Sequence, residues 1–226
     1  MLTALRYGSV VPMLSCPNAA FLLWLPGQFG NKRTSGFGLG QLSFALELGT
    51  GIEAFGSTFS TTGILVSEFA RKIPLSRRSA IDMMRGLLSS CVVGNIFLPG
   101  DLTRAEVKLS SGGSLVVSGG YKESVNSLMY EAKKNLSSTY LKLGSVLLPG
   151  SFTVGPPGGD IHYAGTLPMS IRPVLGQTSQ HGEVEGLKGV YVVDGACLPT
   201  LPAKSHTLTI MANADRIGAF LASKNS

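Results

Sequence analysis

The sequence predicts an α+β fold built on an antiparallel β-sheet with helices on one face. Apolar residues alternate with polar ones in several short segments of the first half of the chain, which is the pattern of half-buried strands. These segments follow one another through hairpin turns, as antiparallel strands do. Three longer segments carry apolar residues at helical spacing. Because strands outnumber helices, we expect the helices to cover one face of the sheet.

Length and composition indicate a folded protein of one domain or of two small ones. Of 226 residues, 44% are apolar and 14% are charged, which suffices for a hydrophobic core and excludes a disordered tail. A mean hydropathy of +0.27 suggests that some apolar surface meets a partner. The apolar run Ala19–Pro26 is too short to span a bilayer and lacks the flanks of a secretory signal, so no membrane span is expected.

Charge and cysteine usage exclude further classes of protein. The net charge of +6 is spread out, and the densest basic patch, residues 71–78, has no interleaved aromatic residues, so no nucleic-acid partner is expected. Cys16, Cys91 and Cys197 are far apart and lack metal-ligand spacing, so no metal site is expected. We expect them to be reduced core thiols in a reducing compartment, which favours the cytoplasm.

Three strands and one helix are predicted between residues 41 and 98. In Gln41–Glu47, the apolar residues Leu42, Phe44 and Leu46 alternate with polar or small ones. Similar strand signals recur in this region, with one segment of helical spacing between them. The further elements are strands at Ile52–Thr61 and Cys91–Leu98 and a helix at Ser76–Ser90.

A hairpin and a long helix complete the first part of the chain. In Ala105–Ser118 an alternating segment, a Ser-Ser-Gly-Gly turn and a returning apolar segment predict a β-hairpin. The helix expected at Lys122–Tyr140 is amphipathic. Its inward positions are Val125, Met129, Ala132 and Leu136.

The amino-acid composition changes near residue 155, where we place a boundary between segments 1–155 and 156–226. Residues 155–170 are rich in Gly and Pro and predict an ordered loop. A strand at Val190–Val193 and a helix at Thr207–Leu221 follow, with Ser205 as the expected N-cap.

Two glycine-rich segments are candidates for dinucleotide-binding loops, and neither meets the requirements. The spacing in 36-GFGLG-40 is wrong for one. The segment 49-GTGIEA-54 has the right spacing, but the β-prone residues after it offer no helix N-terminus for a pyrophosphate, so we interpret it as a hairpin turn. No Walker A loop, zinc ligand set or nucleophile elbow is present, and adjacency of Ser205 and His206 is no evidence for a hydrolytic triad.

Four residues of the C-terminal part are candidates for chemistry. His162 lies in a Gly-rich loop, with Asp160 two residues before it. His206 begins a helix, where the macrodipole disfavours the imidazolium and keeps the ring a competent base. Asp194 closes the predicted strand, and Gly195 allows close backbone approach to a ligand. Taken singly, each of these residues has an ordinary structural alternative.

In order, these segments resemble the C-terminal half of the glucose–methanol–choline (GMC) family of FAD-dependent oxidoreductases. The family has a His followed at three and four residues by Gly-Thr or Gly-Gly, matched here by His162, Gly165 and Thr166. An apolar strand ending in Asp-Gly, a small residue and an aliphatic–Pro pair follows, matched by 190-VYVVDGACLP-199, and 205-SHTLTIMANADRI-217 matches the family's next helix start. The resemblance covers residues 155–222 closely and the earlier residues only in architecture.

The resemblance implies an alcohol oxidation in which hydride passes to FAD. It implies that His162 is the base for the substrate hydroxyl and that a second catalytic position, filled by His206 or by Ser205, orients the substrate oxygen. It also implies that segment 1–155 is the substrate-binding sheet domain and that segment 156–226 contacts the flavin. The residues placed beside FAD are Asp194, Gly195 and Ala196 in the turn and Thr207 and Leu208 at the helix start.

Two departures from the family leave questions open. The family's catalytic Asn falls on Ser205, and His206 falls where a Pro usually stands, so the second catalytic position is either Ser205 or His206, with His206 favoured. The family's N-terminal G-x-G-x-x-G unit for FAD has no match in this sequence, so the expected partners are an FAD-binding half supplied from elsewhere and a small alcohol.

Two alternative functions stay open beside alcohol oxidation. A lyase of the same fold retains FAD only structurally, because a His pair serves acid–base cleavage of a cyanohydrin equally well. A non-catalytic binding or structural module derived from the fold is the other. Flavin reduction by an alcohol separates the oxidoreductase from the lyase, and His162→Ala separates it from the binding module, whose role this variant would leave unchanged.

Overall fold

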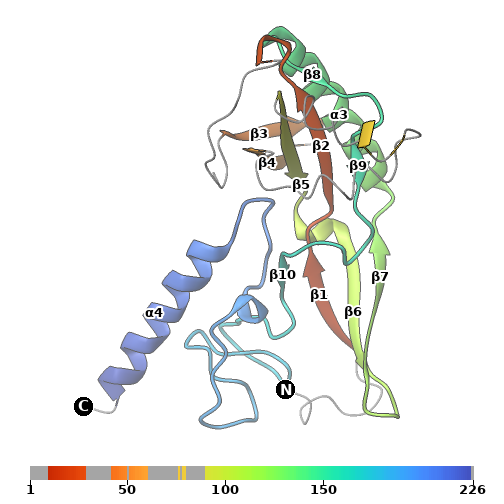
Figure 1. The fold of residues 1–226 in the computed structure, drawn as a ribbon. Helices are drawn as coiled ribbons and strands as arrows, with labels where there is room; N and C mark the ends of the chain where they lie inside the picture. The colour runs from red at the N-terminus through yellow and green to blue at the C-terminus, as the bar shows by residue number, and fades with distance from the viewer. Residues whose placement is uncertain are drawn as a thin grey trace. The chain divides into compact units, whose positions relative to one another are not determined.

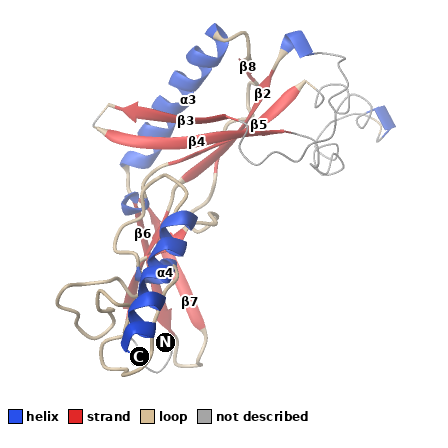
Figure 2. Cartoon of the chain, turned by 90° about the vertical axis from the view of Figure 1, so that its left-hand side faces the viewer, coloured by secondary structure: helices blue, strands red, loops and turns tan. Residues whose placement is uncertain are grey.

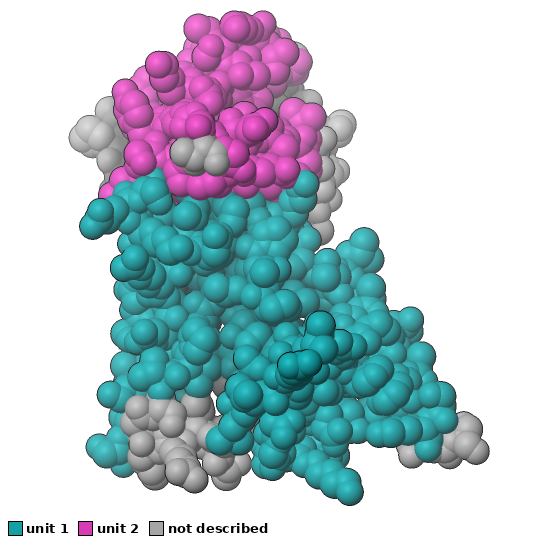
Figure 3. All heavy atoms as spheres, turned by 180° about the vertical axis from the view of Figure 1, so that it is seen from behind, with its two compact units in different colours: residues 1–17, 98–125, 155–226 teal, residues 18–97, 126–154 magenta. Residues whose placement is uncertain are grey.

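The computed structural model describes residues 10–28, 42–49, 51–60, 76, 78–79 and 90–224, and it has the mixed α+β architecture with antiparallel sheets that the sequence predicts. The chain divides into two compact units, each discontinuous in sequence (Figure 3). Unit 1 is residues 1–17, 98–125 and 155–226; unit 2 is residues 18–97 and 126–154. These units differ from the consecutive segments 1–155 and 156–226, whose functional division stays a prediction.

Unit 1 contains a four-stranded antiparallel sheet in the order β10–β1–β6–β7 (Figure 1). The hairpin predicted at Ala105–Ser118 is confirmed, because Leu109 pairs with Leu115 across the turn. Alternate residues of β6 are buried, which is the period-two pattern of a half-buried strand. The strands are β1 (Val10–Ser15), β6 (Thr103–Leu109), β7 (Leu115–Tyr121) and β10 (Tyr163–Ala164).

Unit 2 contains a six-stranded sheet in the order β3–β4–β5–β2–β8, with β9 also paired to β2. The predicted strands at 41–47, 52–61 and 91–98 are confirmed as β3, β4 and β5. The segment 49-GTGIEA-54 is the predicted hairpin turn, since the Gly51 amide donates to the Leu48 carbonyl and Leu48 pairs with Ile52. The strands are β2 (Asn18–Trp24), β3 (Leu42–Leu48), β4 (Ile52–Ser60), β5 (Cys91–Phe97), β8 (Val146–Leu147) and β9 (Thr153–Val154).

Most of helix α3 (Ser124–Lys142) belongs to unit 2 and lies along its sheet (Figure 2). The inward face expected from the sequence is confirmed, because Val125, Met129, Ala132 and Leu136 are all buried. The aromatic ring of Phe21 from β2 forms the centre of this core. It lies between 6.0 and 6.5 Å, centroid to centroid, from three other rings. These rings belong to Phe44, Tyr140 and Phe152.

The C-terminal part of unit 1 consists mainly of turns and ends in helix α4 (Thr207–Lys224). This helix confirms the one predicted at Thr207–Leu221, but Ile217 is its only buried residue. The strand predicted at Val190–Val193 is wrong: only a single antiparallel bridge joins Glu183 to Tyr191. Glycines with positive φ at positions 182, 186 and 189 turn the chain so sharply that no longer ladder forms.

Some sequence-based predictions fall outside the described residues. The helix predicted at Ser76–Ser90, the glycine segment at 36–40 and most of the basic patch at 71–78 are among them. All three cysteines are described, and each is buried as a free thiol, as expected. Within the described part of the chain, neither helix is both long and apolar enough to cross a bilayer.

The aromatic core of unit 2 gives a stability prediction. Phe21 is 1% exposed, so Phe21→Ala leaves a cavity and is expected to lower the free energy of unfolding by about 3–5 kcal/mol. Tyr130→Ala on the exposed face of α3, where Tyr130 is 72% exposed, is the control and should change it by less than about 0.5 kcal/mol. Urea denaturation measures both, and equal effects of the two variants would contradict this packing.

Candidate active site

Two loops of unit 1 that are about thirty residues apart in sequence lie side by side. One follows strand β10 and the other contains the short 3-10 helix η3 (Gly195–Cys197). Backbone amides at alternate residues of the first loop donate hydrogen bonds to backbone carbonyls of the second loop. The bonds join Gly165 N to Gly195 O (3.2 Å), Leu167 N to Ala196 O (2.9 Å) and Met169 N to Cys197 O (2.8 Å). The segments that carry His162 and Asp194 are therefore fixed to each other.

His162 immediately precedes β10, and the pairing of β10 with β1 sets its position. Ser15 is the partner of Tyr163 in this register. Gly165 ends the strand with φ +79°, a conformation that L side chains rarely adopt, and a Cβ there would come within 3.1 Å of the Leu14 side chain. A glycine is thus needed to turn the chain from β10 towards η3.

The structure brings the imidazoles of His162 and His206 together, with ring centroids 5.0 Å apart and ring planes at 81°. Gly195 makes room for this edge-to-face pair. A Cβ at Gly195 would lie 2.7 Å from the carbonyl oxygen of Tyr163 and 3.8 Å from Nε2 of His206. The first distance is shorter than a real Cβ contact, so the absence of a side chain at residue 195 permits the close approach.

His206 is held in its neutral form. It is 9% exposed, and its Nδ1 atom is shielded from solvent with no hydrogen-bond partner in the described part of the chain. Burial lowers the pKa of His206, the charge of His162 lowers it further, and Asp160 opposes the shift. A neutral imidazole can accept or donate a hydrogen bond at the substrate oxygen near neutral pH.

Helix α4 begins at Thr207, one residue later than the expected N-cap implies. The carbonyl of His206 accepts the first helical bond, from the amide of Ile210 at 2.9 Å, so His206 and not Ser205 occupies the N-cap position. The hydroxyl of Ser205 is exposed and lies 3.5 Å from that of Thr207. The first amides of α4 have no acceptor within the helix, and they adjoin the imidazole pair.

Asp160 lies beneath His162 as a buried carboxylate. Its side chain is 1% exposed, and Oδ1 lies 3.7 Å from Nδ1 of His162. Oδ1 accepts the amide of Ile161 at 2.7 Å, and Oδ2 accepts the amide of Cys16 at 3.0 Å. Burial raises the pKa of Asp160, whereas these amides and His162 act in the opposite direction.

Cys16, Asp160 and His162 also offer metal-ligating atoms within 4.8 Å of one another, although the sequence predicts no metal site. The thiol and the carboxylate are already engaged. Burial and the nearby charge of Asp160 raise the pKa of Cys16 to about 12, and its thiol donates to the carbonyl of Pro202. A protonated thiol is a poor metal ligand, so we interpret this group as a polar network. Cys16 lies 144 residues from Asp160, and only the β1–β10 register reveals its contact.

The residues that the resemblance places beside a flavin lie around the imidazole pair. Asp194 caps η3, because its Oδ1 accepts the Ala196 amide at 2.9 Å. Gly195 is buried and Ala196 is half-buried in the same turn. Thr207 and Leu208 are exposed at the start of α4, with Leu208 77% exposed. The structure therefore brings together the predicted turn and the predicted helix start.

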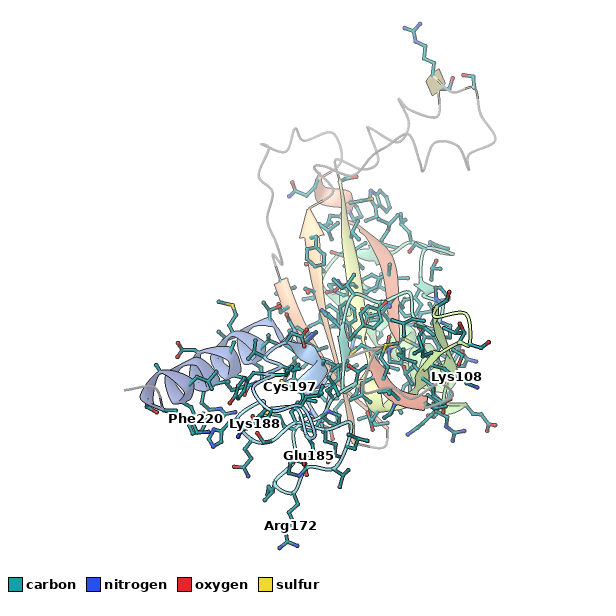
Figure 4. The ribbon with its side chains drawn as sticks, turned by 90° about the horizontal axis from the view of Figure 1, so that it is seen from below. Lys108, Arg172, Glu185, Lys188, Cys197 and Phe220 are labelled. Atoms are coloured by element: carbon teal, nitrogen blue, oxygen red, sulfur yellow. The ribbon has the colours of Figure 1, made fainter. Side chains whose placement is uncertain are left out.

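Contacts along α4 fix it to the loops of unit 1, and they explain His181, to which the sequence assigns no chemistry. His181 stacks on Phe220 with centroids 3.6 Å apart. Arg216 donates to the carbonyl of Gln180 at 2.6 Å and to Oδ1 of Asn213 at 2.9 Å. Figure 4 shows Phe220 on the helix and Cys197 in the loop region beside it. These contacts hold the second half of α4 against the loops of unit 1.

A hollow of about 280 Å³ lies near Arg216 and away from the imidazole pair. Its lining consists of Met169, Ser170, Ile171, Gln180 and Arg216. One nitrogen of the Arg216 guanidinium donates to the Gln180 carbonyl and to Asn213 Oδ1.

The segment that contains this geometry is similar to a known protein family. Residues 159–214 match the family model for the C-terminal region of GMC oxidoreductases. The matched residues include His162, His206 and the loop pair between them. Over these residues the chain is therefore similar to the C-terminal region of GMC oxidoreductases, as the resemblance implies.

A solved structure has the same fold. The crystal structure of pyridoxine 4-oxidase from Mesorbium loti superposes with a TM-score of 0.55 over 92% of this chain, at 13% sequence identity. The chain spans 42% of the length of that protein. None of the curated protein sequences matches this chain.

The lowered pKa of His206 predicts a pH dependence of stability. The unfolded chain has a histidine pKa of about 6.5, so between that value and the lower folded pKa the unfolded state binds more protons. We therefore expect the free energy of unfolding, measured in urea, to fall as the pH is lowered from about 7.5 to about 5.5.

The variant His206→Gln isolates this contribution. It should show a shallower pH dependence than the wild type, whereas His181→Gln should keep the full slope. Asp160, whose pKa is raised, adds a slope of the opposite sign in all three proteins. An unchanged slope in His206→Gln would show that His206 is not held neutral.

Proposed function

We propose that this chain supplies the catalytic residues for the FAD-dependent oxidation of an alcohol. The observation that carries the proposal is the pair of imidazoles, 5.0 Å apart and backed by a helix N-terminus. Oxidation of an alcohol to a carbonyl compound removes the hydroxyl proton and, as hydride, the hydrogen on carbon. One imidazole suits the proton, and a second suits the positioning of the oxygen.

His162 acts as the base. Its side chain is 15% exposed, so it is partly buried and still open to a small substrate. A neutral imidazole accepts the hydroxyl proton at working pH, because the ordinary imidazole pKa lies near neutrality. As the proton leaves, electron density rises at the carbinol carbon and favours departure of the hydride.

His206 orients the substrate oxygen. Its lowered pKa keeps the ring uncharged, so it does not repel the imidazolium that forms on His162. Because its ring meets that of His162 edge to face, His206 lies beside the same small volume in which the substrate oxygen would bind. The exposed hydroxyl of Ser205, whose neighbour is the Thr207 hydroxyl, supports assigning this role to His206.

The residues around the pair fit the ring portion of FAD. The unused first-turn amides of α4, beside Thr207 and Leu208, suit an electron-rich ring edge. The turn of Asp194, Gly195 and Ala196 suits close backbone approach. When bound, FAD supplies the acceptor for the substrate hydride.

We propose that an FAD-binding half of the enzyme covers the exposed apolar side chains of unit 1. Soluble proteins rarely expose so many large apolar residues in one region of a fold without a partner. The exposed apolar residues include Ile161, Ile171, Val174, Leu175, Leu208 and Met211.

Reduced, buried thiols support a cytoplasmic location.

The decisive experiment follows flavin absorbance in the FAD-containing enzyme under anaerobic conditions while alcohols are added. Pyridoxine belongs in the panel because the solved relative is a pyridoxine 4-oxidase. His162→Ala removes the base and should slow flavin reduction by about 10²- to 10⁴-fold.

His181→Gln is the matched control, since His181 stacks on Phe220 and has no part in the proposed chemistry. It should reduce flavin at the wild-type rate. Flavin that is never reduced by alcohols in the wild type, together with cleavage of a cyanohydrin, would favour the lyase. An unchanged rate in His162→Ala would contradict the assignment of the base.

A further inference from the structure

We propose that Asp160 is a positioning residue for His162: its carboxylate binds the proton on Nδ1 and leaves the Nε2 lone pair for the substrate. This inference rests on the proposed function of His162 as the base and names the residue that sets its tautomer. The carboxylate lies beside this imidazole, at 3.7 Å between Oδ1 and Nδ1.

The carboxylate itself is rigidly held. Oδ2 accepts the amide of Cys16 from the end of β1, and Oδ1 accepts the amide of the neighbouring Ile161. The side chain is 1% exposed, so solvent does not compete for it. Because the two oxygens are fixed by backbone groups of different segments, the orientation of the carboxylate towards His162 is set by the fold.

The position of Nδ1 then decides the tautomer. Nδ1 of His162 is shielded from solvent, and Oδ1 of Asp160 lies 3.7 Å from it, slightly beyond hydrogen-bond distance. A carboxylate accepts hydrogen bonds and donates none, so this neighbour favours the proton on Nδ1. The lone pair then lies on Nε2, which is the nitrogen that remains for a substrate hydroxyl. Catalytic hydrogen bonds are often long in unliganded proteins, and we expect this one to shorten when substrate binds.

The same carboxylate favours the transition state. When His162 takes the substrate proton, the ring becomes a cation beside a negative group in a site with little water. The attraction is stronger for the cation than for the neutral ring, so it assists the proton transfer. An exposed carboxylate, such as that of Asp215 on α4, has no comparable effect.

The tautomer can be measured directly because the chain contains only three histidines. Histidine labelled with ¹⁵N gives separate Nδ1 and Nε2 signals in long-range ¹H–¹⁵N spectra, and His181→Gln identifies one of the three rings. We predict that His162 in the wild-type chain carries its proton on Nδ1 at about pH 8. A proton on Nε2 there would overturn the proposal without any variant.

The variants Asp160→Asn and Asp160→Glu test whether the Asp160 carboxylate sets the tautomer of His162. Asp160→Asn removes the charge and should shift His162 away from the Nδ1–H tautomer, whereas Asp160→Glu keeps a carboxylate and should restore it in part. Asp215→Asn removes an equal charge from an exposed position and should leave the tautomer unchanged. Unaltered His162 signals in a folded Asp160→Asn chain would contradict the proposal.

Turnover separates this inference from the proposed function. In the FAD-containing enzyme, Asp160→Asn should lower the rate of flavin reduction by about 10- to 100-fold with little change in KM. If Asp160 fixes the tautomer but His162→Ala leaves the rate unchanged, the proposed function is wrong. The structural role of Asp160 is then retained. Loss of activity in His162→Ala with full activity in Asp160→Asn would sink only the inference.

Discussion

The site depends on the three backbone hydrogen bonds that join the loop after β10 to the loop containing η3. Backbone bonds of this kind fix two segments in one register without requiring particular side chains. The first loop follows β10, which His162 immediately precedes, and the second leads into the helix that begins after His206. Because both loops are fixed to each other, the separation of the two imidazoles is a property of the backbone.

Two glycines make this arrangement possible. Gly165 turns the chain out of β10 in a left-handed conformation, and Gly195 has no side chain where Tyr163 and His206 approach. The electrostatic properties follow from the same packing. Burial beside another imidazole keeps His206 neutral, and the amides of Cys16 and Ile161 hold the Asp160 carboxylate near His162. His162 thus lies beside a fixed carboxylate, and His206 is a neutral ring that can form a hydrogen bond.

Much of the fold was predictable from the sequence, because alternation and helical spacing report local burial. Strands β3 and β6 and helix α3 follow these patterns, whereas the apolar residues at the start of β7 are exposed. The strand expected at Val190–Val193 did not form, since an apolar run does not reveal that the glycines around it limit its pairing to a single bridge. The N-cap of α4 differed by one residue because the first helical bond is accepted by the carbonyl of His206 and not by that of Ser205.

The candidate site was predictable only in part. His162 and His206 could be selected because they lie in ordered motifs, whereas their separation of 5.0 Å comes from tertiary structure. The contact of Asp160 with the Cys16 amide could not be foreseen, because it depends on pairing between strands that are far apart in sequence. Likewise, two consecutive segments were expected where the chain forms two interleaved units.

The most direct measurement of the central claim is a nuclear Overhauser effect between the ring protons of His162 and His206. Because their centroids lie 5.0 Å apart, a cross-peak between these two rings is predicted. The stacked rings of His181 and Phe220, 3.6 Å apart, provide an internal positive control. A spectrum with the His181–Phe220 cross-peak but none between His162 and His206 would contradict the shared site.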